Sequence, residues 1–222
     1  AWAISEAAAM INAAKRPILY LGGGVVHSGA ASVAVDLAEK ANLPTVMTLM
    51  ALGAMPVDHP LSLGMLGMHG ARCTNLALDE CDLLIAVGAR FDDRATGKVA
   101  AFCPQAKIIH IDIDAAELDK IKTAHVGIAA DVHEALARLL PLVSENDRKI
   151  WVDRANALKR DFPQHMPDLD QPLSHFGLIR TVAACLDDDA IIATDVGQHQ
   201  MWVAQGYPLR RPRQWLTSGG LG

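Results

Sequence analysis

Four charged side chains follow an unbroken run of apolar residues near the middle of the chain. The run covers 83–87 and stops at Gly88. A run of this length without alternation favours a strand buried on both faces, as in parallel sheets, over a short buried helix. Ligands of open α/β sheets bind just beyond the carboxyl ends of the strands. The charges therefore form either a ligand site or a solvated turn, and they are Arg90, Asp92, Asp93 and Arg94.

A second candidate site is the glycine run at 22–24, which follows a predicted strand at 18–21. Glycines at this place are typical of nucleotide-binding turns, because they let a phosphate or a ring approach the backbone. The GxGxxG pattern fails, since His27 stands at its third glycine position. No acidic residue ends the next predicted strand, 45–47, where the ribose of NAD would be held. An NAD-dependent dehydrogenase is therefore disfavoured, and a plain tight turn into a helix remains open.

Two acidic residues and one loop complete the candidate site. Asp112 stands at the carboxyl end of a predicted strand at 107–111, where an acidic side chain can bind ribose hydroxyls. Asp131 follows a predicted strand at 125–129 and opens a capping box with Glu134, so it can serve as cap and ligand together. The segment 63–70 interleaves methionine with glycine, which suits either a flat aromatic ligand or a core-filling role.

The composition excludes several classes of protein. The chain has 222 residues, 51% of them hydrophobic, and a net charge of −5, so it lacks the basic footprint of a nucleic-acid-binding protein. No apolar run approaches the ~20 residues of a membrane span, and no signal peptide is apparent. The four cysteines match no zinc or redox spacing. We expect a cytoplasmic protein with reduced thiols and no nucleic-acid or membrane partner.

The order of elements predicts an α/β fold. Predicted strands alternate with predicted helices at 30–42, 70–78 and 147–161, which indicates an open, mostly parallel sheet flanked by helices over residues 1–162. Prolines then mark a linker at 163–174. Residues 175–222 begin a second α/β domain with a helix at 176–186 and a strand at 190–194, and this unit is too short to close its own core. We expect the sequence to be a fragment of a longer chain.

Seven motifs in this order resemble the catalytic subunits of acetohydroxyacid synthases, also called acetolactate synthases, of the bacterial type I kind. The resemblance covers the whole chain. The motifs are LYLGGG at 19–24, TLMALG at 48–53, HPLSLGMLGMHG at 59–70, GARFDDR at 88–94, KIIHIDID at 107–114, TDVGQHQMW at 194–202 and WLTSGGLG at 215–222.

The resemblance implies a thiamine-diphosphate-dependent enzyme of three domains, of which this chain would hold the FAD-binding middle domain and the start of the thiamine-diphosphate domain. The implied reaction decarboxylates pyruvate and adds the resulting hydroxyethyl group to a second 2-ketoacid, pyruvate or 2-ketobutyrate, in branched-chain amino acid biosynthesis. FAD would have a structural role without net redox chemistry. The resemblance also implies a homodimer of catalytic subunits and allows a regulatory small subunit.

The resemblance assigns roles to individual residues. It implies that Arg94 holds the ketoacid carboxylate through two hydrogen bonds, and that Gln198 and His199 face the thiamine site, which Gly222 approaches. It places around the FAD the residues Gly22, Gly23, Gly24, Thr48, Leu49, Leu66, Gly67, Met68, His69, Gly88, Ala89, Arg90, Asp92, Arg94, Asp112, Ile113, Asp131, Gln200, Ser218 and Gly219.

Two essentials of the family are expected outside this sequence: the glutamate that activates the thiamine and the Mg²⁺ ligands that hold its diphosphate. We therefore expect the 222 residues alone to be inactive. Two other interpretations stay open. One is another FAD-containing thiamine-diphosphate enzyme, of the pyruvate oxidase or glyoxylate carboligase type, which Arg94 disfavours. The other is a non-catalytic nucleotide-binding module, which the TDVGQHQMW motif disfavours.

Overall fold

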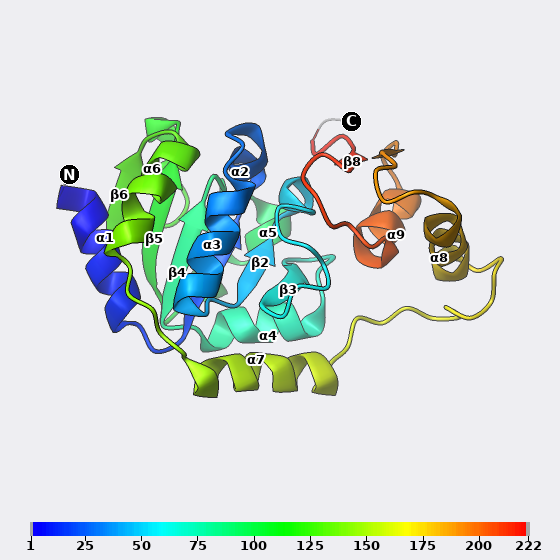
Figure 1. Ribbon diagram of the computed structural model, residues 1–222, viewed down its shortest axis with the longest axis horizontal. Coiled ribbons are helices and arrows are strands. Elements are labelled where there is room, and N and C mark those ends of the chain that lie inside the picture. The colour runs from blue at the N-terminus through cyan, green and yellow to red at the C-terminus, as the bar shows by residue number, and fades with distance from the viewer. Residues whose placement is uncertain (1, 221–222) are drawn as a thin grey trace.

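The computed structural model describes residues 2–220 and contains a six-stranded parallel sheet with helices on both faces, followed by a smaller unit at one edge (Figure 1). The strands lie in the order β3-β2-β1-β4-β5-β6. The predicted α/β class is confirmed. The bounds are Pro17–Leu21 (β1), Thr45–Met47 (β2), Ser62–Met65 (β3), Leu83–Val87 (β4), Lys107–Asp112 (β5) and Val126–Ala129 (β6).

Helices connect these strands and cover the sheet. In α3 the apolar positions recur every three to four residues, so one stripe of the helix is buried, and Asn42 ends it in the left-handed conformation at φ 46°. The α-helices are Trp2–Ala13 (α1), Gly23–His27 (α2), Ala31–Ala41 (α3), Arg72–Glu80 (α4), Asp93–Thr96 (α5), Val132–Leu139 (α6) and Lys149–Asp161 (α7). Short 3₁₀ turns lie at Leu49–Ala51, Val99–Ala101, Ala115–Glu117 and Leu140–Leu142.

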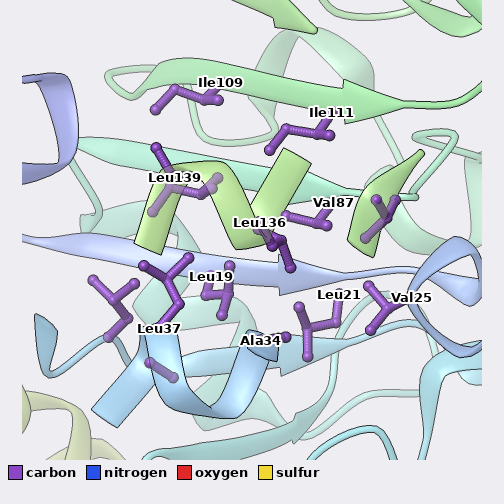
Figure 2. Close-up of a cluster of buried hydrophobic side chains, with 14 of the residues drawn as sticks. Leu19, Leu21, Val25, Ala34, Leu37, Val87, Ile109, Ile111, Leu136 and Leu139 are labelled. Atoms are coloured by element: carbon purple, nitrogen blue, oxygen red, sulfur yellow. The ribbon is translucent and has the colours of Figure 1, made fainter. Parts of the chain in front are cut away.

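One face of the sheet packs against α1, α2, α3 and α6, where successive strands contribute every second residue to a continuous apolar core (Figure 2). The side chains of α3 and α6 meet over the middle of the sheet. Burial on both faces explains why the strands read as unbroken apolar runs. The residues labelled in that view are Leu19, Leu21, Val25, Ala34, Leu37, Val87, Ile109, Ile111, Leu136 and Leu139.

The other face is covered by α4 and α7 and by an aromatic cluster near the carboxyl ends of the strands. Phe91 lies edge-on to Tyr20 and to Phe102, with ring centroids 5.7 and 6.2 Å apart. All three rings are buried. Phe91 belongs to the segment that follows β4, so this packing fixes the start of that segment against the sheet.

The smaller unit lies beyond β3 and follows residues 163–174, a described segment that contains no helix or strand, as its prolines predict. Its elements are His175–Cys185 (α8), Ile192–Ala193 (β7), Gln198–Gly206 (α9) and Trp215–Leu216 (β8). A small apolar cluster joins it to Met65 of β3. Leu178, Val182 and Leu186 of this unit remain exposed. The domain boundaries at 162 and 174 stay a prediction.

The sequence did not predict β3 and α9. Between the register pairs Thr45↔Ser62 and Met47↔Met65, β3 contains one extra residue, and Gly64 there has φ +75°. This bulge breaks the alternation of inward- and outward-facing residues from which an edge strand is predicted. In the part of the chain that the structure describes, no helix is long and apolar enough to span a membrane.

Candidate cofactor cleft

A cleft of about 1020 Å³ runs along the carboxyl edge of the sheet and reaches the smaller unit. The sheet order changes direction between β1 and β4, because the chain leaves β1 towards β2 and β3 and later returns to β4 on the other side. The loops after these two strands therefore diverge and leave room for a ligand. The sequence prediction of a site at the end of β4 agrees with this topology.

The glycine turn after β1 packs directly on the backbone after β4. The Gly22 N–H donates to Val87 O at 2.8 Å, and the Gly24 N–H donates to Gly88 O at 3.1 Å. A Cβ on Gly22 would lie 2.0 Å from Gly88 O, and Gly88 itself has φ +59°. Gly22 and Gly24 thus have a structural reason to be glycine, and Gly23 and Gly24 line the cleft.

The segment after β4 brings charged groups to the cleft. Arg90 is exposed, lines the cleft and makes no hydrogen bond or ion pair within residues 2–220. Asp92 caps α5 by accepting from the Ala95 N–H at 3.0 Å. Arg94 also lines the cleft, and its exposed guanidinium pairs with Asp93 at 2.7 Å. The cleft therefore offers two guanidinium groups that solvent or a ligand can reach.

His110 of β5 contacts this segment at Ala89 and Phe91, and this role was not predicted from the sequence. Its side chain is buried beside Phe91, with ring centroids 5.0 Å apart. Nε2 lies 2.9 Å from Ala89 O, and since a carbonyl can only accept, Nε2 carries the hydrogen. Nδ1 has no hydrogen-bond partner among the described residues. Burial lowers the pKa of His110, although the Ala89 carbonyl acts in the opposite direction, so the ring is held neutral.

The methionine-glycine segment after β3 packs against α5. Gly67 has φ +89°, and a Cβ there would lie 2.3 Å from Arg94 O. Asn75 of α4 holds both backbone groups of Gly67, accepting from its N–H and donating to its carbonyl, each at 2.9 Å. Leu66 and His69 line the cleft, but the Met68 side chain is exposed and lies outside its lining. Asn75 is a second positioning residue that carries no signal in the sequence.

The smaller unit forms the opposite wall. Gln200 is buried and donates from Nε2 to Thr217 Oγ1 and to Ser218 O, both at 2.8 Å. Thr194 joins the same network by donating to Thr217 Oγ1 at 2.9 Å. Gln198 lines the cleft, while His199 does not. Side-chain hydrogen bonds therefore fix where the 217–220 segment lies.

The acidic residues divide into cleft and cap positions. Asp112 is buried at the end of β5 and lines the cleft, and its Oδ1 accepts from the Asp114 N–H at 2.9 Å. Asp131 caps α6 by accepting from the Glu134 N–H at 3.1 Å and is not part of the lining. Ile113 is exposed and also lies outside the lining. The capping prediction for Asp131 is confirmed, and a ligand role for it stays a prediction.

Most of the predicted residues share one cleft. The lining includes Gly23, Gly24, Thr48, Leu49, Leu66, His69, Gly88, Ala89, Arg90, Asp92, Arg94, Asp112, Gln198, Gln200, Ser218 and Gly219. Outside it lie Gly22, Gly67, Met68, Ile113, Asp131 and His199. Gly222 falls outside the described residues. Met65 also lines the cleft and belongs to the segment 63–70, which the sequence left open between a ligand contact and a core-filling role. Sequence reasoning missed His27, Met50, Ala95, Asp114, Glu117, Val196, Gly197, Met201 and Gly220, most of which are neighbours of predicted residues.

The strand order and the cleft define an open, doubly wound α/β domain of the type that binds extended nucleotides at its switch point. Residues 4–139 match the family model for the thiamine pyrophosphate enzyme central domain. Residues 195–222 match the model for the thiamine pyrophosphate enzyme C-terminal TPP binding domain. The chain belongs to the thiamine pyrophosphate enzyme family.

Curated relatives are similar over almost the whole chain. The acetolactate synthase isozyme 1 large subunit of Escherichia coli (strain K12) is 66% identical over 219 residues, which cover 99% of this chain and 39% of that protein. The acetolactate synthase large subunit of Corynebacterium glutamicum is 47% identical, with coverages of 99% and 36%. Acetolactate synthase 2, chloroplastic, of Zea mays is 46% identical, with coverages of 96% and 34%. The chain thus spans less than half the length of these relatives.

Proposed function

We propose that these residues form part of the catalytic subunit of an acetolactate synthase. The subunit would join pyruvate to a second 2-oxo acid, pyruvate or 2-oxobutyrate, with loss of CO₂, as a step of branched-chain amino acid biosynthesis. The observation that carries the proposal is that residues from both family-matched regions line one cleft. Relatives named acetolactate synthase in bacteria and a plant support it.

The cleft fits FAD as a bound cofactor of the first unit, the part of the chain that contains the six-stranded sheet. It passes the ends of β5, β4, β1, β2 and β3, and five strands spaced about 4.8 Å apart match an extended dinucleotide. Asp112 lines the cleft at the carboxyl end of β5, where its carboxylate could accept hydrogen bonds from ribose hydroxyls. Thr48 provides a direct test of fit: its Oγ1 is buried at the cleft and has no hydrogen-bond partner within residues 2–220. A bound flavin would supply that missing partner.

Thiamine diphosphate would bind on the side of the smaller unit, where it supplies the electron sink for decarboxylation and carbon–carbon bond formation. Gln198 of the smaller unit lines the cleft, as a thiamine-facing residue would. Residues 2–220 contain no cluster of three histidine, cysteine or acidic side chains that could hold a metal ion. The proposal therefore assigns the Mg²⁺ ligands to other parts of the enzyme. A homodimer and a regulatory small subunit are part of the same proposal.

Arg94 would bind the carboxylate of the incoming 2-oxo acid. Its position supports this role, since it lines the cleft four residues beyond Arg90 and keeps most of its side chain exposed. The competing explanation is the ion pair with Asp93 on an exposed turn, and such a pair stabilises a fold by about 1 kcal/mol or less. A planar guanidinium can donate two parallel hydrogen bonds to a carboxylate, which lysine cannot reproduce.

The test is Arg94→Lys in the full-length enzyme, with 2-oxo acid kinetics and flavin content measured on the same preparation. We expect normal flavin and a kcat/KM for the second 2-oxo acid that is about ten- to a hundredfold lower, because hydrogen bonds to charged groups contribute about 1.5–3 kcal/mol. Unchanged kinetics with normal flavin would contradict the carboxylate-binding role and leave the ion pair with Asp93 as the only role of Arg94. Loss of flavin together with activity would move Arg94 into the flavin site.

A further inference from the structure

A second cavity, of about 320 Å³, lies behind the cleft between β3, the segment after α7 and the smaller unit. Among the described residues, it shares only Met65 and His69 with the cleft lining. Most of its wall is apolar, and the apolar lining includes Leu63 of β3 and Tyr207 and Leu209 of the smaller unit. Its volume falls at the low end of the roughly 300–1,000 Å³ that small-molecule sites occupy. The cavity therefore suits a small ligand with an apolar body.

Two polar residues, Ser62 and Lys159, lie together at one place in this wall. The wall's other polar side chains include His69, Gln164 and Gln205. Ser62 is 2% exposed, and its Oγ has no hydrogen-bond partner in the described part of the chain. Lys159 of α7 lines the cavity too, and its Nζ donates to the Ser62 backbone carbonyl at 2.9 Å. No carboxylate within residues 2–220 pairs with Lys159, so two of its three N–H donors have no protein partner.

An unsatisfied hydroxyl and a partly satisfied ammonium at the end of an apolar cavity define the ligand's chemistry. Leaving a buried hydroxyl without a partner is unfavourable, so a ligand or a water that supplies one is favoured. A carboxylate can accept from Lys159 Nζ and Ser62 Oγ at once, while an aliphatic body contacts the apolar wall. A phosphate would find one ammonium and no arginine among the lining residues. A metal cation would meet a positive charge.

We infer that this rear cavity binds a small aliphatic monocarboxylate of about four to six carbons. The inference does not depend on the proposed activity, because neither Lys159 nor Ser62 lines the cleft. Lys159 provides the charge, Ser62 provides a hydrogen bond, and the β3 and 207–209 side chains exclude water from the ligand's body.

The experiment titrates the full-length holoprotein with 3-methylbutanoate by calorimetry, and with the uncharged 3-methylbutanamide as the matched probe. We expect the acid to bind and the amide to bind at least about tenfold more weakly. Lys159→Met should lower the affinity for the acid by about ten- to a hundredfold. Lys149→Met is the control on the same helix, since Lys149 pairs with Asp153 at 2.8 Å outside the cavity, and it should bind as the parent does.

Ser62→Ala gives an independent readout. Because it removes a hydroxyl that has no partner, it should leave the melting temperature unchanged or raise it. The affinity for the acid should fall by about two- to tenfold. Arg94→Lys separates the rear cavity from the cleft and should retain parent affinity for the acid. No binding by the parent, meaning that a buried water alone satisfies Ser62, would overturn the inference. Binding lost in Arg94→Lys but kept in Lys159→Met would overturn it as well.

Discussion

The two walls of the cleft are held by different kinds of contact. On the wall formed by β1 and β4, the backbone of Gly22 and Gly24 touches the backbone of Gly88 with no room for a Cβ. On the opposite wall, the 217–220 segment is held by side-chain hydrogen bonds centred on Gln200. The first wall is therefore fixed by the sheet itself, and the second depends on a few amide and hydroxyl groups in a unit with exposed apolar side chains.

The largest effect is expected where the first wall is closed. Gly22→Ala places a Cβ 2.0 Å from Gly88 O, so β1 and β4 must separate at their carboxyl ends. We expect the free energy of unfolding to fall by about 3 kcal/mol or more, with loss of flavin. Gly220→Ala is the matched control, because a Cβ there meets nothing within 4 Å. Chemical denaturation measures both, and a Gly22→Ala protein as stable as this control would disprove the backbone-on-backbone description.

A smaller and more local effect is expected on the second wall. Gln200→Ala removes both hydrogen bonds from Nε2 and leaves Ser218 O without that donor. We expect a loss of about 1–3 kcal/mol that is confined to the smaller unit. Hydrogen exchange with mass spectrometry should show faster exchange in 215–218 and unchanged exchange in β1 and β4. Equal acceleration in both walls would show that they form one cooperative unit and remove the distinction.

The smallest effect concerns pH and the first wall alone. Because burial lowers the pKa of His110 from 6.5, the unfolded chain binds a proton there that the folded protein resists. The contribution of His110 to stability is thus present above pH 6.5 and is lost as the pH falls through the lowered pKa, by at most about 1.4 kcal/mol per pH unit. In His110→Gln, denaturation midpoints should depend less steeply on pH in this range. An identical slope in parent and variant would show that His110 does not titrate against folding.

The sequence predicted most of the first unit because its signals are local. Buried runs such as Leu83–Val87 predicted strands, and Asp131 predicted a helix cap that the structure contains. The topology rule then predicted a site at the strand ends, where Arg90, Arg94 and Asp112 do line one cleft.

The missed features depend on contacts between distant segments. The bulge at Gly64 interrupts the residue alternation by which β3 could have been predicted. The role of His110 depends on its hydrogen bond to Ala89 O, which lies 21 positions away in the sequence. Asn75, in the first turn of α4, forms hydrogen bonds with both backbone groups of Gly67. No spacing rule predicts this contact from the sequence. The glycine run was interpreted as a place for ligand approach, yet Gly22 is required because the backbone of Gly88 and Ala89, just after β4, leaves no room for a Cβ.

The central claim is that the cleft holds FAD, and two threonines near β2 test it most directly. Thr48 Oγ1 is buried without a partner at the cleft, whereas Thr45 Oγ1 donates to Leu43 O at 2.9 Å away from it. The measurement is fluorescence titration of the full-length apoprotein with FAD, for the parent, Thr48→Val and Thr45→Val. The account predicts that the parent binds FAD, that Thr48→Val binds about two- to tenfold more weakly without losing stability, and that Thr45→Val loses stability but keeps parent affinity. An apoprotein that takes up no FAD, or equal affinity in all three proteins, would contradict it.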